Sequence, residues 1–536
     1  MNENEKTFGN ITIKVKKKKE GAPADKVKDL VSGEIGTYTI EAKVNKIIQT
    51  RGPTIFKVMD ESGCADIGGF VSPGERAYPD IVENDCVRAT VKIEMKSDIK
   101  RMNIVEMTKI ESLSLKVDEM IDGAKEPEDA DVKFTIKSPA LDALKDKFKS
   151  ASALIKKSIY EGRQILIRHH ADMDGYAGGI ALEKAILPLI EKRFGERDKW
   201  FCFERSPSTT PFYEYKDVLK DLVSAKRSIE RFGKLEPLVI LVDNGSTEED
   251  LLSIRKARIY NIPIIVVDHH FTEVKGGKSV VDSFVDVHIN PYLVGGDKNL
   301  TAGMLAYELS RVINPTVDDM KVLPALAGIG DRSSGTEFEE YVKKCGKDKE
   351  HLKKVAQCVD YEASYLKFMQ DSGLVWDMIS GDEKNEALVN LLYEDIQEKI
   401  NAQSKALLKY VNEETLKNGV VAALIDITGS TQRGDFPGPG KSAGILNDEL
   451  NQKHGKKKLV TIGYGPDFIT MRSNDACEKI GFNVNVFVAR LAEDIPHGMV
   501  SGGGHEVAGS IKFVESAKDE VLGKLVGYIE ELRAKD

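Results

Sequence analysis

Residues 262–267, Ile-Pro-Ile-Ile-Val-Val, form an uninterrupted apolar run that ends in Asp268-His269-His270. A short run rich in Ile and Val, without polar alternation, predicts a strand buried on both faces. Ionisable side chains at the end of such a strand lose hydration, which costs several kcal/mol unless a partner compensates them. One metal ion, or a pair of ions, is the simplest compensation for all three groups together.

Two further runs, residues 164–168 and 238–242, have the same form, and each is followed by charged residues. Amphipathic helix patterns lie between the three runs. This alternation predicts an α/β fold with a doubly wound parallel sheet. In such sheets ligands bind beyond the carboxyl ends of the strands, which is where the charged residues fall.

The chain has 536 residues, too many for one hydrophobic core, so we expect several domains. The expected segments are a polar basic tail (1–33), a small β domain (34–112), a linker (113–145), a parallel-sheet domain (146–335), a helical insertion with a long connector helix near 385–413 (336–418), and a smaller α/β domain (419–536).

Composition restricts the class of protein. The net charge of −9 argues against a surface coated by nucleic acid, although it leaves room for a local basic groove. The 6 cysteines are scattered without a Cys-x-x-Cys pair, which predicts reduced thiols rather than disulfides or a zinc site. No apolar stretch is long enough to span a membrane, and the first residues lack a signal-peptide pattern. We therefore expect a cytoplasmic protein without a membrane partner.

Alternating apolar and polar residues from Tyr38 onward, with turns at 49–53 and 61–63, predict five short strands and a small β-barrel. The segment resembles an OB-fold, a class that often binds single strands on a basic, aromatic-studded face. For any one candidate, core packing or a solvated edge is the favoured interpretation. The candidates are Arg51, Phe56, Phe70, Tyr78, Lys100 and Arg101. The lysine run 16–19 is either a solvated tail or an arm for a polyanion.

Acidic and imidazole side chains come from four separate segments, three of which follow predicted strands. Taken singly, Asp174 could belong to a turn, Asp243 could cap a helix and Asp331 could end one. Their joint occurrence is harder to explain this way, because a parallel sheet gathers such residues at one rim. The segments are 168–175, 242–246, 268–270 and 328–332.

With these four segments in order over residues 163–335, the chain resembles the DHH phosphoesterase superfamily. Residues 501–505, Ser-Gly-Gly-Gly-His, resemble the Gly-Gly-Gly-His loop of the DHH-associated C-terminal domain. Together with an OB-like domain, the chain looks most like the RecJ-like single-strand exonucleases, especially their archaeal branch. Two features depart from bacterial RecJ: the barrel comes first in the chain, and His170 stands where bacterial RecJ has a third Asp.

The resemblance implies two-metal-ion hydrolysis of a phosphodiester, with Asp243 bridging the ions. His170 and Asp172 would bind one ion. The ligands implied for the other ion are Asp174, His269 and Asp331. Mixed carboxylate and imidazole ligands favour Mn²⁺, with Mg²⁺ or Co²⁺ as substitutes.

Two further groups of residues have implied roles. Asp268 would orient an imidazole, as carboxylates often do beside metal-bound histidine. His270 would contact the scissile phosphate or protonate the leaving oxygen. The implied substrate-binding residues are Arg472, Ser473, Gly502, Gly503, Gly504 and His505.

Three functions remain open at this stage. The first is a metal-dependent exonuclease that degrades single-stranded DNA, RNA or both to mononucleotides in DNA replication or repair. The second is an oligonucleotide or cyclic-dinucleotide phosphodiesterase, which has less need of a strand-binding barrel. The third is a replisome scaffold that works beside a helicase with GINS-type proteins as partners.

Overall fold

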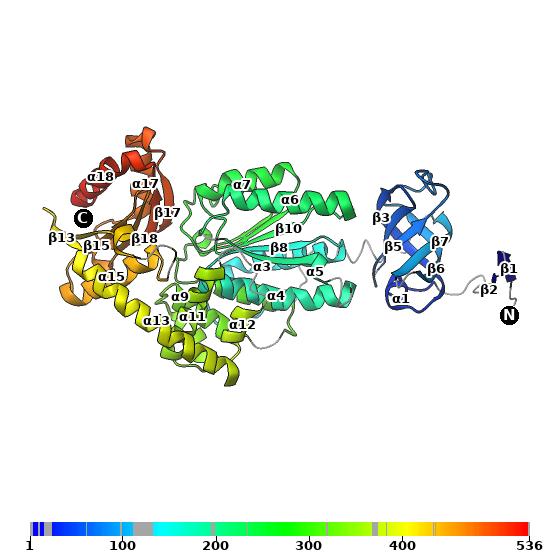
Figure 1. The fold of residues 1–536 in the computed structure, drawn as a ribbon, viewed down its shortest axis with the longest axis horizontal. Coiled ribbons are helices and arrows are strands. Elements are labelled where there is room, and N and C mark those ends of the chain that lie inside the picture. Colours follow the sequence, from blue (N-terminus) through cyan, green and yellow to red (C-terminus); the bar gives the residue numbers. More distant parts are fainter. Residues whose placement is uncertain are drawn as a thin grey trace.

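Figure 1 shows the computed structural model, which describes residues 4–8, 11–15, 24–60, 62–96, 99–110, 132–194, 199–208, 210–232, 234–317, 320–366, 373–381, 383–431, 434 and 436–533. The lysine run 16–19 and most of the expected linker lie outside these residues. None of the helices in the described ranges is both long and apolar enough to cross a membrane.

The predicted N-terminal barrel is present as a closed sheet with strand order β3-β4-β5-β7-β6. Its strands are β3 (Gly36–Gln49), β4 (Thr54–Asp60), β5 (Gly63–Gly69), β6 (Cys86–Lys96) and β7 (Ile99–Ile110). Ahead of it, β1 (Asn4–Phe8) pairs antiparallel with β2 (Ile11–Val15). Assignment of the barrel to the OB class stays a prediction.

The polar-tail assignment for residues 1–33 differs from the structure at its C-terminal end. Helix α1 (Val27–Ser32) packs on the barrel, with Val27 and Leu30 fully buried in its core. The sequence around α1 is polar, so the helical spacing of Val27 and Leu30 alone did not predict a helix. Among the barrel candidates, Phe56 is a core residue that packs edge-on against Tyr78, and Lys100 donates to the carbonyls of residues 31 and 33.

The central sheet is the predicted parallel sheet, with order β12-β11-β10-β8-β9 and parallel pairing throughout. Its strands are β8 (Ile165–His170), β9 (Phe203–Ser208), β10 (Leu238–Val242), β11 (Ile264–Val267) and β12 (Val287–Ile289). In chain order this is 2-1-3-4-5 read from β9, a doubly wound arrangement whose order reverses between β8 and β10.

Alternate residues of these strands enter two different cores. Ile240 and Ile265 face a large core built with helices α3, α4, α8 and α9, whereas Leu241 and Val266 face α6 and α7. Figure 1 shows α6 and α7 above the sheet and α4 below it. The helices are α3 (Pro139–Tyr160), α4 (Met173–Phe194), α5 (Lys199–Cys202), α6 (Tyr215–Phe232), α7 (Glu248–Ile259), η1 (Pro291–Val294), α8 (Ala302–Ile313) and α9 (Val322–Gly330).

Helix α3 begins inside the segment predicted as a linker. Ser138 caps it by accepting from the Leu141 amide, and Leu141 and Leu144 are buried in the large core. The charged residues between these positions occupy the solvated face, which is why the segment reads as a linker in the sequence.

The helical insertion consists of α10 (Thr336–Cys345), α11 (Lys349–Leu366), α12 (Leu374–Ile379) and α13 (Glu383–Tyr410). Helix α13 confirms the predicted long connector helix. It leads into a mixed sheet of order β13-β14-β15-β16-β18-β17.

This C-terminal sheet has helices on both faces. Its elements are β13 (Asn412–Thr415), β14 (Val421–Asp426), α14 (Ile427–Ser430), α15 (Pro439–His454), β15 (Leu459–Tyr464), β16 (Phe468–Ser473), α16 (Asp475–Glu478), α17 (Val484–Asp494), η2 (Pro496–Gly498), β17 (Ser501–His505), β18 (Ala508–Lys512), η3 (Glu515–Ala517) and α18 (Lys518–Glu531). α17 and α18 share one core, and α15 shares the other with the end of α13.

Candidate metal centre

The carboxyl ends of β8, β10 and β11 meet where the strand order of the central sheet reverses. Val242, the last residue of β10, lies in register with His169 of β8 and with Val267, the last residue of β11. The three strands therefore end side by side, and the residues that follow them begin next to one another at one edge of the sheet. This is the position at which doubly wound sheets bind ligands.

A first group of potential ligands forms around His170. Its Nδ1 atom lies 2.8 Å from Asp172 Oδ2 and 3.3 Å from Asp243 Oδ2. The Gly175 amide donates to the other Asp172 oxygen over 3.0 Å and fixes that carboxylate at the start of α4. Ligand atoms of His170, Asp172 and Asp243 all lie within 4.8 Å of one another.

A second group forms around His269 and shares Asp243 with the first. His269 Nε2 lies 3.3 Å from Asp243 Oδ1 and 3.6 Å from Asp174 Oδ2. Asp331, at the C-terminal end of α9, places Oδ2 2.9 Å from the same nitrogen. The structure thus brings together all the residues predicted as metal ligands, in two groups on either side of one carboxylate.

The burial of Asp243 and its lack of hydrogen bonds are the features that best fit a cation site. The residue is 1% exposed, and neither carboxylate oxygen has a hydrogen-bond partner among the described residues. Its φ of 57° is a left-handed conformation that costs about 1–3 kcal/mol and is found where function demands it. Because a buried carboxylate without hydrogen bonds is costly, the donor set around Asp243 fits divalent cations.

The flanking carboxylates have opposite electrostatic surroundings. Both Asp174 oxygens accept from the start of α8, from the Ala302 amide over 3.0 Å and the Gly303 amide over 2.9 Å. Burial and the neighbouring carboxylates nevertheless raise the pKa of Asp174 well above its usual range. Burial also opposes ionisation of Asp331, but the His269 and His505 imidazoles hold its pKa well below the usual range. The group as a whole is short of positive charge, as expected for a cation site.

Asp268 lies beside Asp243, with ligand atoms of Asp243, Asp268 and His270 within 4.8 Å of one another, and it fixes His270. Its Oδ1 accepts from His270 Nδ1 over 2.8 Å, and from the amides of His269 and His270 over 2.8 and 3.2 Å. Burial opposes ionisation of Asp268, but the adjacent His270 imidazole lowers its pKa. Burial likewise opposes the charged form of His270, and Asp268 raises its pKa to about 9. With Nδ1 engaged, the other ring nitrogen of His270 is the one available to a ligand.

A hydrogen-bond chain behind Asp268 escaped sequence reasoning. Asp282 Oδ1 lies 2.7 Å from His288 Nδ1, and His288 Nε2 lies 2.9 Å from Ser246 Oγ. Asn290 Nδ2 donates to Ser246 Oγ and to the His270 carbonyl, each over 3.0 Å. The Ser246 amide donates to Asp268 Oδ2 over 3.1 Å. The chain therefore holds the backbone on both sides of the Asp268–His270 pair.

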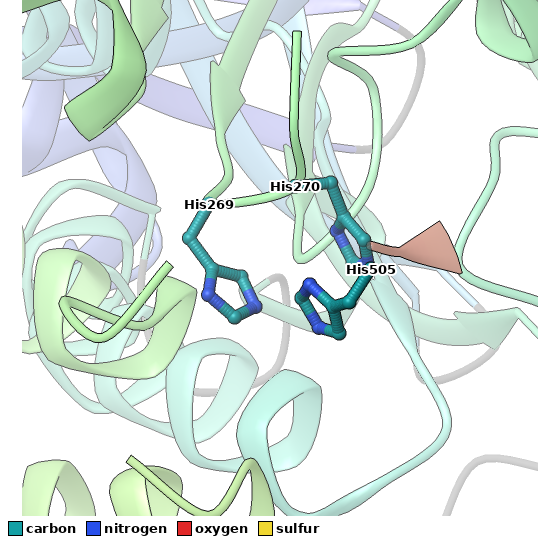
Figure 2. Close-up of side chains that lie close together, drawn as sticks. All are labelled: His269, His270 and His505. Carbon is teal, nitrogen blue, oxygen red and sulfur yellow. The ribbon is translucent and has the colours of Figure 1, made fainter. Parts of the chain in front are cut away.

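His505 reaches this centre from the C-terminal domain. Figure 2 shows its ring beside those of His269 and His270, although β17 lies far along the chain. The His505 and His270 rings stack at 4.7 Å with 7° between their planes. His505 Nε2 lies 3.7 Å from Asp331 Oδ2. Predicted as a substrate-binding residue, His505 thus lies against His270 and against the second ligand group, through His269 and Asp331.

The three glycines before His505 form a strand, not the predicted loop. Gly502, Gly503 and Gly504 pair with β18 at φ values of 151°, 157° and 139°, a region open to glycine. A Cβ on Gly503 would lie 3.4 Å from Phe212 of the central domain. The glycines therefore let the backbone of an edge strand approach the catalytic domain closely.

The predicted Arg472–Ser473 pair ends β16 beside α15. Burial, reinforced by the neighbouring Arg332 guanidinium, lowers the pKa of Arg472 to about 10. Ser473 Oγ is buried without a hydrogen-bond partner among the described residues. Arg332 bridges the two domains through Asp448, with contacts of 3.0 and 2.9 Å.

The chain is similar to a curated protein and to a solved structure, at 41% and 42% identity. The uncharacterized protein MJ1198 of Methanocaldococcus jannaschii is 41% identical over 555 aligned positions, which cover 97% of this chain and 73% of the relative. A solved DHH domain, that of PF0399, described as a member of the S1p family of ribosomal proteins, is 42% identical with a TM-score of 0.73 and covers 78% of this chain and 97% of that one.

More distant similarity extends to exonuclease RecJ bound to manganese, at 15% identity and a TM-score of 0.47, covering 72% of this chain and 95% of that one. No family model matches the chain.

Proposed function

The chain belongs to the DHH phosphoesterase superfamily, and from that premise we propose that it is a metal-dependent exonuclease, RecJ-like in type, that degrades single-stranded DNA or RNA to mononucleotides. The observation that carries the proposal is the buried carboxylate of Asp243. Both of its oxygens lack hydrogen-bond partners, and each faces a different imidazole with further carboxylates beside it.

Two divalent ions bound there would supply a nucleophilic hydroxide at neutral pH and neutralise charge on the phosphate. His170 and Asp172 would hold one ion, and Asp174, His269 and Asp331 the other, with Asp243 between them. Mixed nitrogen and oxygen donors support Mn²⁺, with Mg²⁺ or Co²⁺ as substitutes.

Side chains and backbone amides of the protein would bind the substrate, and His270 would supply a proton. Asp268 holds His270 Nδ1, so that the opposite ring nitrogen can contact the scissile phosphate or donate to the leaving oxygen. His505, which belongs to the C-terminal domain, stacks on His270 and would lie beside the same phosphate. The backbone amides of Gly502–Gly504 and the guanidinium of Arg472 would bind neighbouring phosphates.

The test uses the purified chain with Mn²⁺ and oligonucleotides of DNA and RNA labelled at either end. The expected result is stepwise release of mononucleotides from one end, lost in Asp243→Ala with the circular-dichroism spectrum retained. A preference for molecules of two to five nucleotides would instead support an oligonucleotide phosphodiesterase. Absence of cleavage by metal-loaded protein, combined with capture of helicase or GINS-type proteins, would support the scaffold function.

A further inference from the structure

The N-terminal barrel lies at the end of the central domain that is opposite the C-terminal domain, as Figure 1 shows. A β-bulge at Asn45 turns that residue and Lys46 toward the central domain. Asn45 Nδ2 donates to the carbonyl of Glu161, just before β8, and Lys46 Nζ donates to that of Lys234, just before β10, each over 3.2 Å. These contacts lie at the amino-terminal rim of the sheet.

The length of helix α4 gives the distance between the metal centre and the barrel. The helix begins at Met173, between two metal-site carboxylates, and ends at Phe194 beside the barrel. Arg193, in its last turn, lies 3.6 Å from the Cys64 sulfur of the barrel. At 1.5 Å per residue, its 22 residues span about 33 Å. A nucleic-acid strand held near the barrel must therefore cross the whole domain to be cut.

Two adjacent aromatic side chains stand exposed at this junction. Trp200 is 58% and Phe201 is 64% exposed, on the short helix α5 that leads into the amino-terminal end of β9. Lys234 Nζ, whose carbonyl receives Lys46, lies 6.0 Å from the Phe201 ring centre, and Lys199 Nζ lies 5.7 Å from that of Trp200. The aromatic pair and the barrel thus share one edge of the molecule.

Lys199 and Lys234 lie beside the two rings, and Lys46 and Arg193 add positive charge to the junction of barrel and central domain. The hydrogen bonds shown for Lys46 and Arg193 run to main-chain carbonyls and a thiol, none of which neutralises a cation. Lys199 is partly neutralised by Glu191 at 2.8 Å. Exposed aromatic rings among cations are the arrangement on which single-stranded nucleic acids stack their bases while their phosphates meet the charges. A protein partner would gain less from the cations.

We propose that Trp200 and Phe201 form a base-stacking platform for single-stranded nucleic acid, remote from the metal centre. The effect of the platform on cleavage rests on the proposed function. A strand that occupies both the platform and the metal centre must span about 33 Å, which is roughly ten nucleotides at the 3.4 Å spacing of a stacked strand. Longer strands use both sites, and shorter ones reach the metal centre alone.

Binding is tested without cleavage, in EDTA. The chain has 2 tryptophans, so Trp376→Phe leaves Trp200 as the sole indole reporter. A 30-mer of deoxythymidylate should quench its fluorescence, whereas a tetramer at equal phosphate concentration should quench it much less. Trp200→Ala and Phe201→Ala should each weaken binding of the 30-mer roughly 5- to 150-fold, the range for loss of one stacked base. Tyr410→Ala, 61% exposed on α13, is the matched control and should bind normally.

Cleavage with Mn²⁺ then separates the two proposals. Trp200→Ala should lower kcat/KM for the 30-mer while leaving that for the tetramer unchanged. Quenching and weakened binding without any cleavage would overturn the nuclease and leave the platform standing. Unquenched fluorescence together with wild-type affinity in both alanine variants would overturn the platform and assign the pair to a protein contact.

Discussion

Replacing Asp243 with asparagine isolates the charge that the two ligand groups share. The substitution changes almost no volume, and asparagine tolerates the left-handed backbone, φ 57°, that this residue adopts. The fold should therefore persist, while both groups lose their common anionic ligand.

The magnitude follows from linkage. An ion that binds only the folded state stabilises it by about 2.7 kcal/mol at a concentration 100 times its Kd. For a domain of the size of residues 146–335, each kcal/mol added to the free energy of unfolding raises Tm by roughly 2–4 °C. Mn²⁺ should therefore raise the Tm of the wild type by roughly 5–11 °C. In Asp243→Asn the Mn²⁺-dependent rise should fall below about 2 °C. Nuclease activity should fall by more than the 10–100-fold that is typical of residues outside the ligand set.

Differential scanning calorimetry with and without Mn²⁺ measures this shift. Asp250→Asn is the matched control, because Asp250 is fully buried in the same domain but accepts from the Thr247 amide at the start of α7 and lies outside both ligand groups. Its Mn²⁺-dependent shift should equal that of the wild type. A wild-type shift in Asp243→Asn would refute the assignment of the shared ligand.

Three further predictions concern residues around this centre. Asp268→Asn should lower kcat roughly 10–100-fold while preserving most of the Mn²⁺-dependent Tm shift, because it disturbs His270 rather than a ligand; equal loss of both would contradict this. Gly503→Ala should raise KM, since a Cβ at φ 157° would be strained and would lie 3.2 Å from Asn485 Oδ1, whereas Gly523→Ala on α18, with nothing within 4 Å, should leave KM unchanged. Burial raises the pKa of Asp250 to about 7, so this group favours folding below pH 4 and that contribution is lost as pH rises to about 7. Urea unfolding should show the difference between wild type and Asp250→Asn declining over this range, and a pH-independent difference would exclude it.

Strand periodicity predicted which residues gather at the candidate metal centre, because these residues follow buried strands directly. Alternation along β8 distinguishes His170, which faces Asp172 and Asp243, from His169. The His169 ring lies instead against Arg205, with 3.2 Å between Nε2 and the guanidinium. Burial and that cation lower the pKa of His169 to about 3, so it is a neutral core residue. A local pattern was sufficient here because adjacent strand residues point to opposite faces.

Features that depend on packing between distant segments could not be predicted from the sequence pattern. The glycine triplet reads as a loop because glycine usually marks one, yet positive φ values let these residues continue an edge strand. The Ser246–His288–Asp282 chain joins side chains whose individual patterns are those of ordinary loop and strand residues. No spacing in the sequence encodes their contact.

The position of His505 shows how the two kinds of information combine. The motif identifies the residue, but only the packing of β17 against the central domain brings its ring onto His270. Arg332–Asp448 and the Tyr292–Glu506 contact at 3.3 Å hold the same two domains together near the site. Since His505 also lies 3.7 Å from Asp331, a change in domain packing would alter the surroundings of the ligands and of the proposed phosphate contact together. The relative placement of the domains is therefore part of the site, although each domain contributes its own residues by local rules.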